Sequence, residues 1–288
     1  MRNGRTMMLV LLALSCSLGR APAQETPAPS SPEAFYSSAV ESMRALPQPQ
    51  YATFTMEGEG DNLSIGLRII RHLVWLEMIT GPAGFPSTWS IRHRTDDYSS
   101  EITDYDGRRL VSTRAFFDPT WYGAFRALRD GMLMYQQTDA PVSSYATPAP
   151  GPSPDLRTIA VVTVIGSNVY RVEDRGAATC ANGDPGHALH LVSREPDPRH
   201  QLADVTVDLR NMHFCTMRFN VRESGFSGSV EQHYGSVGGY WLQTDGVIET
   251  GIRTLGIMVG HGVWRYRLTQ MTFPRSISAE TFARPWYQ

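Results

Sequence analysis

Hydrophobic and polar residues alternate along most of this chain with a period of two, which predicts β-strands. In the segment 51–58, Phe54 and Met56 share one face with alanine while threonine and glutamate fill the other. The segments 203–209 and 215–221 alternate in the same way. Short turns separate these segments, so the pattern predicts a meander of antiparallel strands.

Asp-Gly pairs mark two of the expected turns. Asp106-Gly107 lies between the strand-like segments 101–105 and 110–117 and predicts a hairpin. A second pair at 245–246 predicts a turn that divides the segment 239–255 into two strands.

Helical spacing of apolar residues occurs in two places. The segment 33–46 follows a Ser-Ser-Pro start signal and ends before Pro47. The second helix is expected after Asp118-Pro119 and carries a broad apolar stripe. This stripe consists of Trp121, Phe125, Leu128, Met132 and Tyr135.

Together these patterns predict a mainly β protein with about ten to twelve strands and two helices. So many strands twist too far to remain flat, so we expect a single curved antiparallel sheet that forms a half-open barrel. The two helices would cover its concave face. Strands at 73–79 and 158–165 are apolar on both faces, which also indicates a covered sheet. We expect one β-rich domain over 33–288, with a Pro-rich loop at 140–155.

The first 23 residues have the features of a secretory signal peptide. Arg2 and Arg5 precede the apolar run Met7–Leu14, and Ala21-Pro22-Ala23 offers small residues for cleavage. The mature chain would therefore begin with a flexible segment at 24–32 and work outside the cytoplasm, in a periplasmic or extracellular compartment.

Cys16 allows a second way for this signal peptide to be processed. Ala13-Leu14-Ser15-Cys16 resembles a lipoprotein processing site, although alanine stands where such sites usually carry leucine. The Ala-, Pro- and Ser-rich segment 17–32 would then be a tether to the membrane. We favour the soluble ending and keep a lipidated Cys16, with peripheral membrane association, as the alternative.

Cys180 and Cys215 are the two cysteines of the mature chain. In an oxidising compartment two cysteines are what one disulfide needs, so we expect them to pair. The alternative is a pair of buried free thiols.

Charge excludes one class of partner. The net charge is −2, the isoelectric point is about 6.4, all basic residues apart from histidine are arginine, and no basic run occurs. Nothing in the chain would attract nucleic acid.

No catalytic or metal-binding pattern stands out, so we expect a non-enzymatic protein without a cofactor. His187 and His190 would lie on opposite faces of a strand, which is poor metal geometry. The segment 225–228 lacks the spacing of a nucleophile elbow. A triad assembled by folding stays open, because triads are defined by geometry.

The order of elements resembles the lipoprotein-carrier superfamily, the LolA/LolB-like proteins. The stretches that carry the resemblance are Phe35–Tyr51, Leu202–Met217 and Glu231–Trp241. It implies an incompletely closed barrel whose concave face is covered by helices, and a hydrophobic cleft between them that binds acyl chains.

We therefore expect a lipid, an acyl chain or another hydrophobic ligand to bind in such a cleft. Alternatives are an envelope interaction module with a filled core, which would bind envelope proteins along its sheet edges, and, more weakly, a hydrolase on the concave face. The candidate cleft residues are large apolar side chains. They are Phe54, Met56, Trp75, Trp121, Phe125, Met132, Met217, Phe219 and Trp264.

Overall fold

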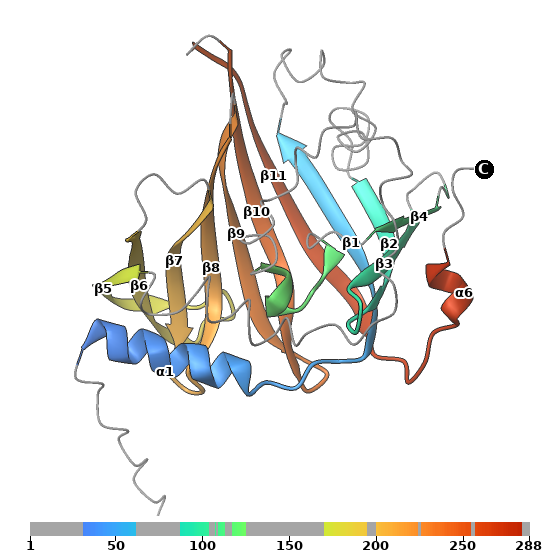
Figure 1. Ribbon diagram of the computed structural model, residues 1–288, viewed down its shortest axis with the longest axis horizontal. Coiled ribbons are helices and arrows are strands. Elements are labelled where there is room, and N and C mark those ends of the chain that lie inside the picture. Colours follow the sequence, from blue (N-terminus) through green and yellow to red (C-terminus); the bar gives the residue numbers. More distant parts are fainter. Residues whose placement is uncertain are drawn as a thin grey trace, which may run out of the picture.

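A computed structural model describes most of the strand-rich parts of the chain (Figure 1). The described residues are 31–61, 87–103, 107, 109–112, 117–124, 170–194, 200–223, 226–254 and 257–283. Several expected features lie outside them: the signal segment 1–23 with Cys16, the segment 24–30, the strands at 73–79 and 158–165, and the loop at 140–155.

Within the described residues, eleven strands form one antiparallel sheet, in the order β4-β3-β2-β1-β11-β10-β9-β8-β7-β6-β5. The edge strands β4 and β5 do not pair, so the curved sheet stays open and confirms the expected fold class (Figure 1). The strands are β1 (Tyr51–Asp61), β2 (Ser87–Arg94), β3 (Ser99–Thr103), β4 (Arg109–Ser112), β5 (Tyr170–Thr179), β6 (Pro185–Ser193), β7 (His200–Asp208), β8 (His213–Glu223), β9 (Phe226–Val237), β10 (Tyr240–Thr254) and β11 (Ile257–Thr272).

Helix α1 (Pro32–Arg44) forms where the sequence predicts it. The Ser31 hydroxyl accepts a hydrogen bond from the Ala34 backbone N–H. Proline suits the first helical position because it has no N–H that would need a hydrogen-bond partner there. The buried face of α1 packs on β5 and β8, and the Tyr36 ring stacks on Phe214 with 5.8 Å between ring centroids. This helix therefore covers the β5–β8 part of the sheet.

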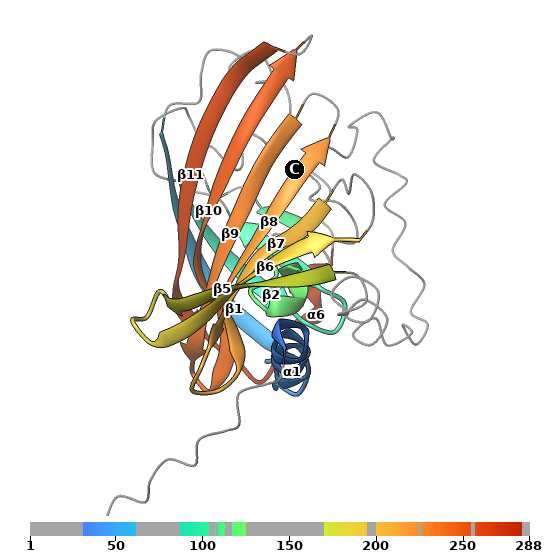
Figure 2. The ribbon, with the colours of Figure 1, turned by 90° about the vertical axis from the view of Figure 1, so that its left-hand side faces the viewer.

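The second helix begins just after Asp118-Pro119, and its described residues are 121–124. The Asp118 carboxylate accepts a hydrogen bond from the Thr120 N–H at 2.9 Å, as a residue at a helix start does. Figure 2 shows this helix and α1 on the same side of the sheet, and Trp121 belongs to the same buried cluster as the residues of α1. None of the described helices, including α6 (Ala279–Phe282), is long and apolar enough to cross a membrane.

The sheet has an apolar inner face, toward α1, and a polar outer face. On β1, for example, Phe54 and Met56 are buried, whereas Thr53, Thr55 and Glu57 are partly or fully exposed. The period-two alternation of the sequence thus becomes a separation of the two faces.

The turn expected at Asp245-Gly246 is wrong, because β10 runs unbroken through this pair. The pairing of β10 with β9 instead shifts register between Gln243 and Asp245. A Cβ atom at Gly246 would lie 2.6 Å from both the Glu231 carbonyl oxygen and the Tyr266 hydroxyl. Glycine is needed here for the close approach of Tyr266, and not for a turn.

Other turns agree with the sequence. β3 and β4 pair as the hairpin expected around Gly107, which has a φ of 79°. β1 continues to Asp61, beyond the segment 51–58 in which the sequence alternates.

Acidic and basic residues face one another across the outer face. The row runs Glu173, His190, Asp204, Arg218 and Glu231, and continues from His233 through Asp245 and Arg267 to Glu57. His233 is the best-connected member: its Nδ1 bonds to Asp245 and its Nε2 lies 3.0 Å from Glu231. These two bonds raise the pKa of His233 from 6.5 to about 9, and they lower the pKa of both carboxyls.

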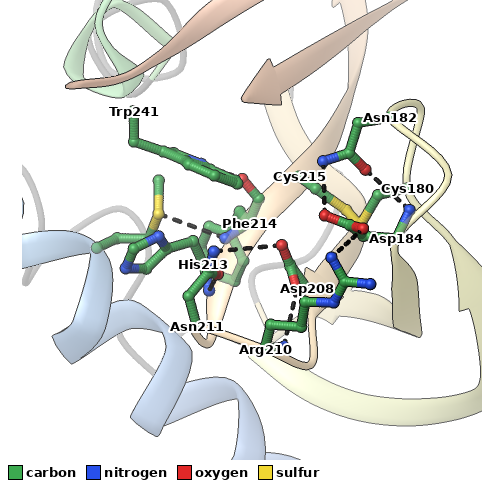
Figure 3. The surroundings of a disulfide bond; sticks show 11 residues. Cys180, Asn182, Asp184, Asp208, Arg210, Asn211, His213, Phe214, Cys215 and Trp241 are labelled. Carbon is green, nitrogen blue, oxygen red and sulfur yellow. Dashed lines mark hydrogen bonds and ion pairs between the residues drawn. A yellow bond between two sulfur atoms is a disulfide. The ribbon is translucent and has the colours of Figure 1, made fainter. Parts of the chain in front are cut away.

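The expected disulfide between Cys180 and Cys215 is present (Figure 3). Cys180 begins the β5–β6 turn, where its N–H donates to the Asp184 carbonyl at 2.9 Å, and Cys215 lies on β8. The bond joins residues 35 apart in sequence, so it ties the β5–β6 hairpin to a strand two positions beyond β6 in the sheet.

Replacing both cysteines by alanine should lower the free energy of unfolding by about 4 kcal/mol, because a 35-residue loop in the unfolded chain is no longer closed. Urea unfolding of the oxidised protein and the C180A/C215A variant measures this difference. Adding a thiol reductant to the variant is the control and should change nothing. A loss below about 1 kcal/mol would contradict the expected contribution.

Stability should fall as the pH rises from about 7 to above 9. The folded pKa of His233 lies above its unfolded value of 6.5, so its contribution is complete below pH 6.5 and is lost as the pH passes about 9. Allowing for partial solvent exposure, the loss should be about 2 kcal/mol. Urea unfolding across this range should show the slope in the wild type and a much smaller slope in H233Q. The H261Q variant, at an exposed position of β11, should keep the wild-type slope.

Candidate functional site

The inner face is continuous across the sheet because the strand register aligns buried residues side by side. One row crosses five strands from β7 to β11, and each member is directly opposite the next in the strand register. This row is Leu202, Phe219, Val230, Ile248 and Trp264, all of them buried. The result is a band of large apolar side chains across the middle of the concave face.

A second row lies beside the first and contains two glycines. It runs Met217, Gln232, Gly246, Tyr266 and Gly58. A Cβ atom at Gly58 would lie 2.6 Å from Cε2 of Trp264, and Gly246 gives the same room to Tyr266. Both aromatic rings therefore lie close over the sheet backbone, and they stack on each other with 4.8 Å between centroids.

Six of the nine candidate cleft residues belong to one buried cluster. They are Phe54, Met56, Trp121, Met217, Phe219 and Trp264, each no more than 7% exposed. Trp75, Phe125 and Met132 lie outside the described residues. The structure therefore brings together strand residues that are more than 200 positions apart in the sequence.

Sequence analysis missed a polar group within this apolar face. Gln232 donates to the side-chain oxygen of Gln243 at 3.3 Å and accepts from the Tyr234 hydroxyl at 2.8 Å. Gln243 also donates to the Tyr266 hydroxyl. Burial raises the pKa of Tyr266 to about 12 and that of Tyr234 well above its usual value, so both phenols stay neutral. No spacing in the sequence marks these four residues as partners.

Residues 117–124, which we call the cap segment, cross the inner face and bond to β10. The Gln243 N–H donates to the Pro119 carbonyl at 2.8 Å, and Thr120 forms an antiparallel bridge with Leu242. The pairing of β10 with β11 begins only at Asp245. The cap segment therefore pairs with β10 at Leu242 and Gln243, where β11 does not.

Asp118, near the start of the cap segment, belongs to a buried Ser-His-Asp group. His93 Nδ1 lies 2.9 Å from the Ser100 hydroxyl oxygen, and His93 Nε2 lies 3.4 Å from the Asp118 carboxylate. This proximity is what a hydrolase on the concave face would require. It could not be read from the sequence, in which Asp118 looked like a helix start and His93 had no partner.

The Ser100 hydroxyl has two partners within reach. It donates to the Phe117 carbonyl at 3.3 Å, and it lies against His93 Nδ1, whose role as donor or acceptor depends on the tautomer of the ring. All three residues are at most 2% exposed. The group holds the cap segment against β2 and β3.

His187 and His190 lie on opposite faces of β6, as expected, and each pairs with one aspartate. His187 Nε2 lies 2.8 Å from Asp174, and His190 Nδ1 lies 2.7 Å from Asp204. Within the described ranges no three His, Cys, Asp or Glu side chains come together as metal ligands.

No protein-family model and no curated protein matches this chain. Solved structures do align with it. One is described as an outer membrane lipoprotein-sorting protein domain from Vibrio parahaemolyticus, with 9% identity, a TM-score of 0.42, and coverage of 88% of this chain and 97% of that one.

Two further structures align over similar lengths. A DUF1329 family protein from Desulfovibrio piger has 8% identity, a TM-score of 0.39, and coverage of 87% and 96%. A LolA superfamily protein from Nitrosomonas europaea has 10% identity, a TM-score of 0.38, and coverage of 86% and 97%.

The G58A variant should be destabilised by about 1–3 kcal/mol, because its new methyl group needs the space of the Trp264 ring. The near-ultraviolet circular dichroism of the tryptophans should change as well. G235A is the matched control, since a Cβ there meets only Thr244 Cγ2 at 3.6 Å, an ordinary contact. Its stability should stay within about 1 kcal/mol of the wild type. Equal stabilities of the two variants would show that Trp264 does not lie against Gly58.

Proposed function

We propose that this chain is an exported protein without enzymatic activity, which binds a hydrophobic ligand such as an acyl chain between the curved sheet and its helices. The observation that carries the proposal is the single apolar face that crosses the open sheet from β5 to β3. Its lining combines rigid aromatic rings with flexible methionines, Met56 and Met217, which suits ligands of variable shape.

The dimensions of the sheet support this proposal. Eleven strands at about 4.8 Å spacing make a face about 48 Å wide, measured along its curve. Helix α1, with 13 residues, is about 20 Å long and packs on β5 and β8. The band formed by Ile248 and Trp264 belongs to β10 and β11, whereas α1 packs mainly on β5 and β8. An acyl chain lying along this band would gain about 0.8 kcal/mol for each methylene removed from water.

Two features support export. Residues 1–23 have the sequence of a secretory signal, and the Cys180–Cys215 disulfide requires an oxidising compartment to form and persist. Under this proposal the ligand would be a lipid or lipid-like molecule of the cell envelope. Processing after Ala23 would leave a soluble carrier, whereas a lipidated Cys16 would leave a membrane-anchored one.

Mass spectrometry of the protein purified from its native envelope tests the proposal. The intact protein is measured first under native conditions and then after denaturation and organic extraction. Acyl species that appear only after denaturation would support a carrier and identify the class of its ligand. A protein without extractable lipid, which also fails to bind added fatty acids, would overturn the proposal and favour a filled-core interaction module.

A pair of variants locates the binding face. W264L removes an aromatic ring from the inner face and should weaken the binding of a fluorescent fatty acid several-fold. R265L changes the neighbouring residue, which is exposed on the outer face, and should leave the affinity unchanged. A loss of affinity in R265L equal to that in W264L would place the ligand elsewhere.

A further inference from the structure

Trp89 carries a hydrogen-bond donor that has no partner among the residues that the structure describes. Its indole Nε1 is buried without a hydrogen bond, although the whole residue is only 2% exposed. The side chain lies on the inner face of β2, next to Met56 of β1 in the strand register. Its ring packs edge-on against Trp264, with 5.8 Å between centroids. The donor therefore belongs to the proposed binding face.

Another buried tryptophan shows the usual arrangement. The indole N–H of Trp241 donates to the Phe214 carbonyl at 2.9 Å. Leaving such a group unbonded in the interior is unfavourable, so an unpaired buried donor requires an explanation. An acceptor that arrives with a ligand would remove this cost, and the gain would count toward binding.

The charges around Trp89 indicate what kind of acceptor fits. Arg92 alternates with Trp89 along β2 and is exposed on the outer face, and Arg265 and Arg267 are likewise exposed on β11. The described base on the inner face of β2 is His93, which is held by Ser100 and Asp118. A carboxylate or phosphate next to Trp89 would therefore lose its hydrating water without contacting a positively charged side chain among the described residues. A neutral carbonyl oxygen loses much less.

We propose that the Trp89 indole N–H binds an uncharged carbonyl oxygen of the ligand, so that the site prefers ester- or amide-linked acyl chains to free fatty acids and hydrocarbons. This inference rests on the proposed function. It assigns Trp89 as the residue that sets ligand selectivity, while the apolar band supplies most of the affinity. The ester or amide group would lie near the Trp89–Trp264 pair, with the acyl chain extending along the inner face.

Displacement of a fluorescent lipid probe by two competitors tests this assignment. The competitors are a long-chain fatty acid methyl ester and an n-alkane with the same number of heavy atoms. The wild type should prefer the ester about five- to ten-fold, as expected for one neutral hydrogen bond that satisfies a buried donor. In W89F, which keeps an aromatic ring but lacks the N–H, this preference should disappear while alkane affinity stays nearly constant.

W241F is the matched control, because it also removes a buried indole N–H, but one that already has a partner in the protein. It should keep the wild-type preference for the ester. An unchanged preference in W89F would overturn the role of Trp89 and leave the proposed function intact, since both competitors would still bind. If neither competitor displaces the probe from the wild type, or the probe itself does not bind, the proposed function fails as well.

A second measurement is made on the wild type, and W89F serves only to assign one signal. The chain contains six tryptophans, so nitrogen-15 spectra should resolve up to six indole N–H signals. Adding the methyl ester should move one of them downfield, and the alkane should not; in W89F that signal should be missing. Ester binding without a downfield shift of any indole N–H would rule out the proposed hydrogen bond.

Discussion

Backbone hydrogen bonding between neighbouring strands fixes the register of the sheet, and this register places the large side chains of separate segments on one face. Phe219 on β8, Ile248 on β10 and Trp264 on β11 come into line only because each pair of strands between them keeps its alignment. A slip of one residue in any pair would turn one strand's apolar residues outward. The apolar face, the helix that packs on it and the proposed ligand site all depend on this alignment.

The irregular positions of the sheet are where the inner face becomes specialised. The register shift at Gln243–Asp245 coincides with the point where β11 separates from β10, and there the cap segment pairs with Leu242 and Gln243. The amide and phenol network around Gln232 lies at the same place. Each buried polar group that is introduced there has hydrogen-bond partners, which is the condition for keeping polar groups in an apolar layer.

Much of the architecture could be predicted from local sequence, because alternation and helix-start signals depend on neighbours a few residues away. The inner position of Phe54 and Met56 and the start of α1 follow from such patterns. The turn predicted at Asp245-Gly246 was wrong because the glycine makes room for Tyr266, which lies on another strand. The His93–Ser100–Asp118 group was missed for the same reason: it joins two strands to the cap segment by folding alone.

The disulfide makes the two margins of the sheet mechanically unequal. It fastens the β5–β6 turn to β8, and α1 packs on the same strands, so this margin should move as one stiff unit. The opposite margin consists of β2, β3 and β4, which have 8, 5 and 4 residues and contain no cysteine. Any change in the radius of curvature should therefore be taken up by bending on the β2–β4 side. Trp89 lies on that side, so the width of the opening and the position of the ligand-binding donor would change together.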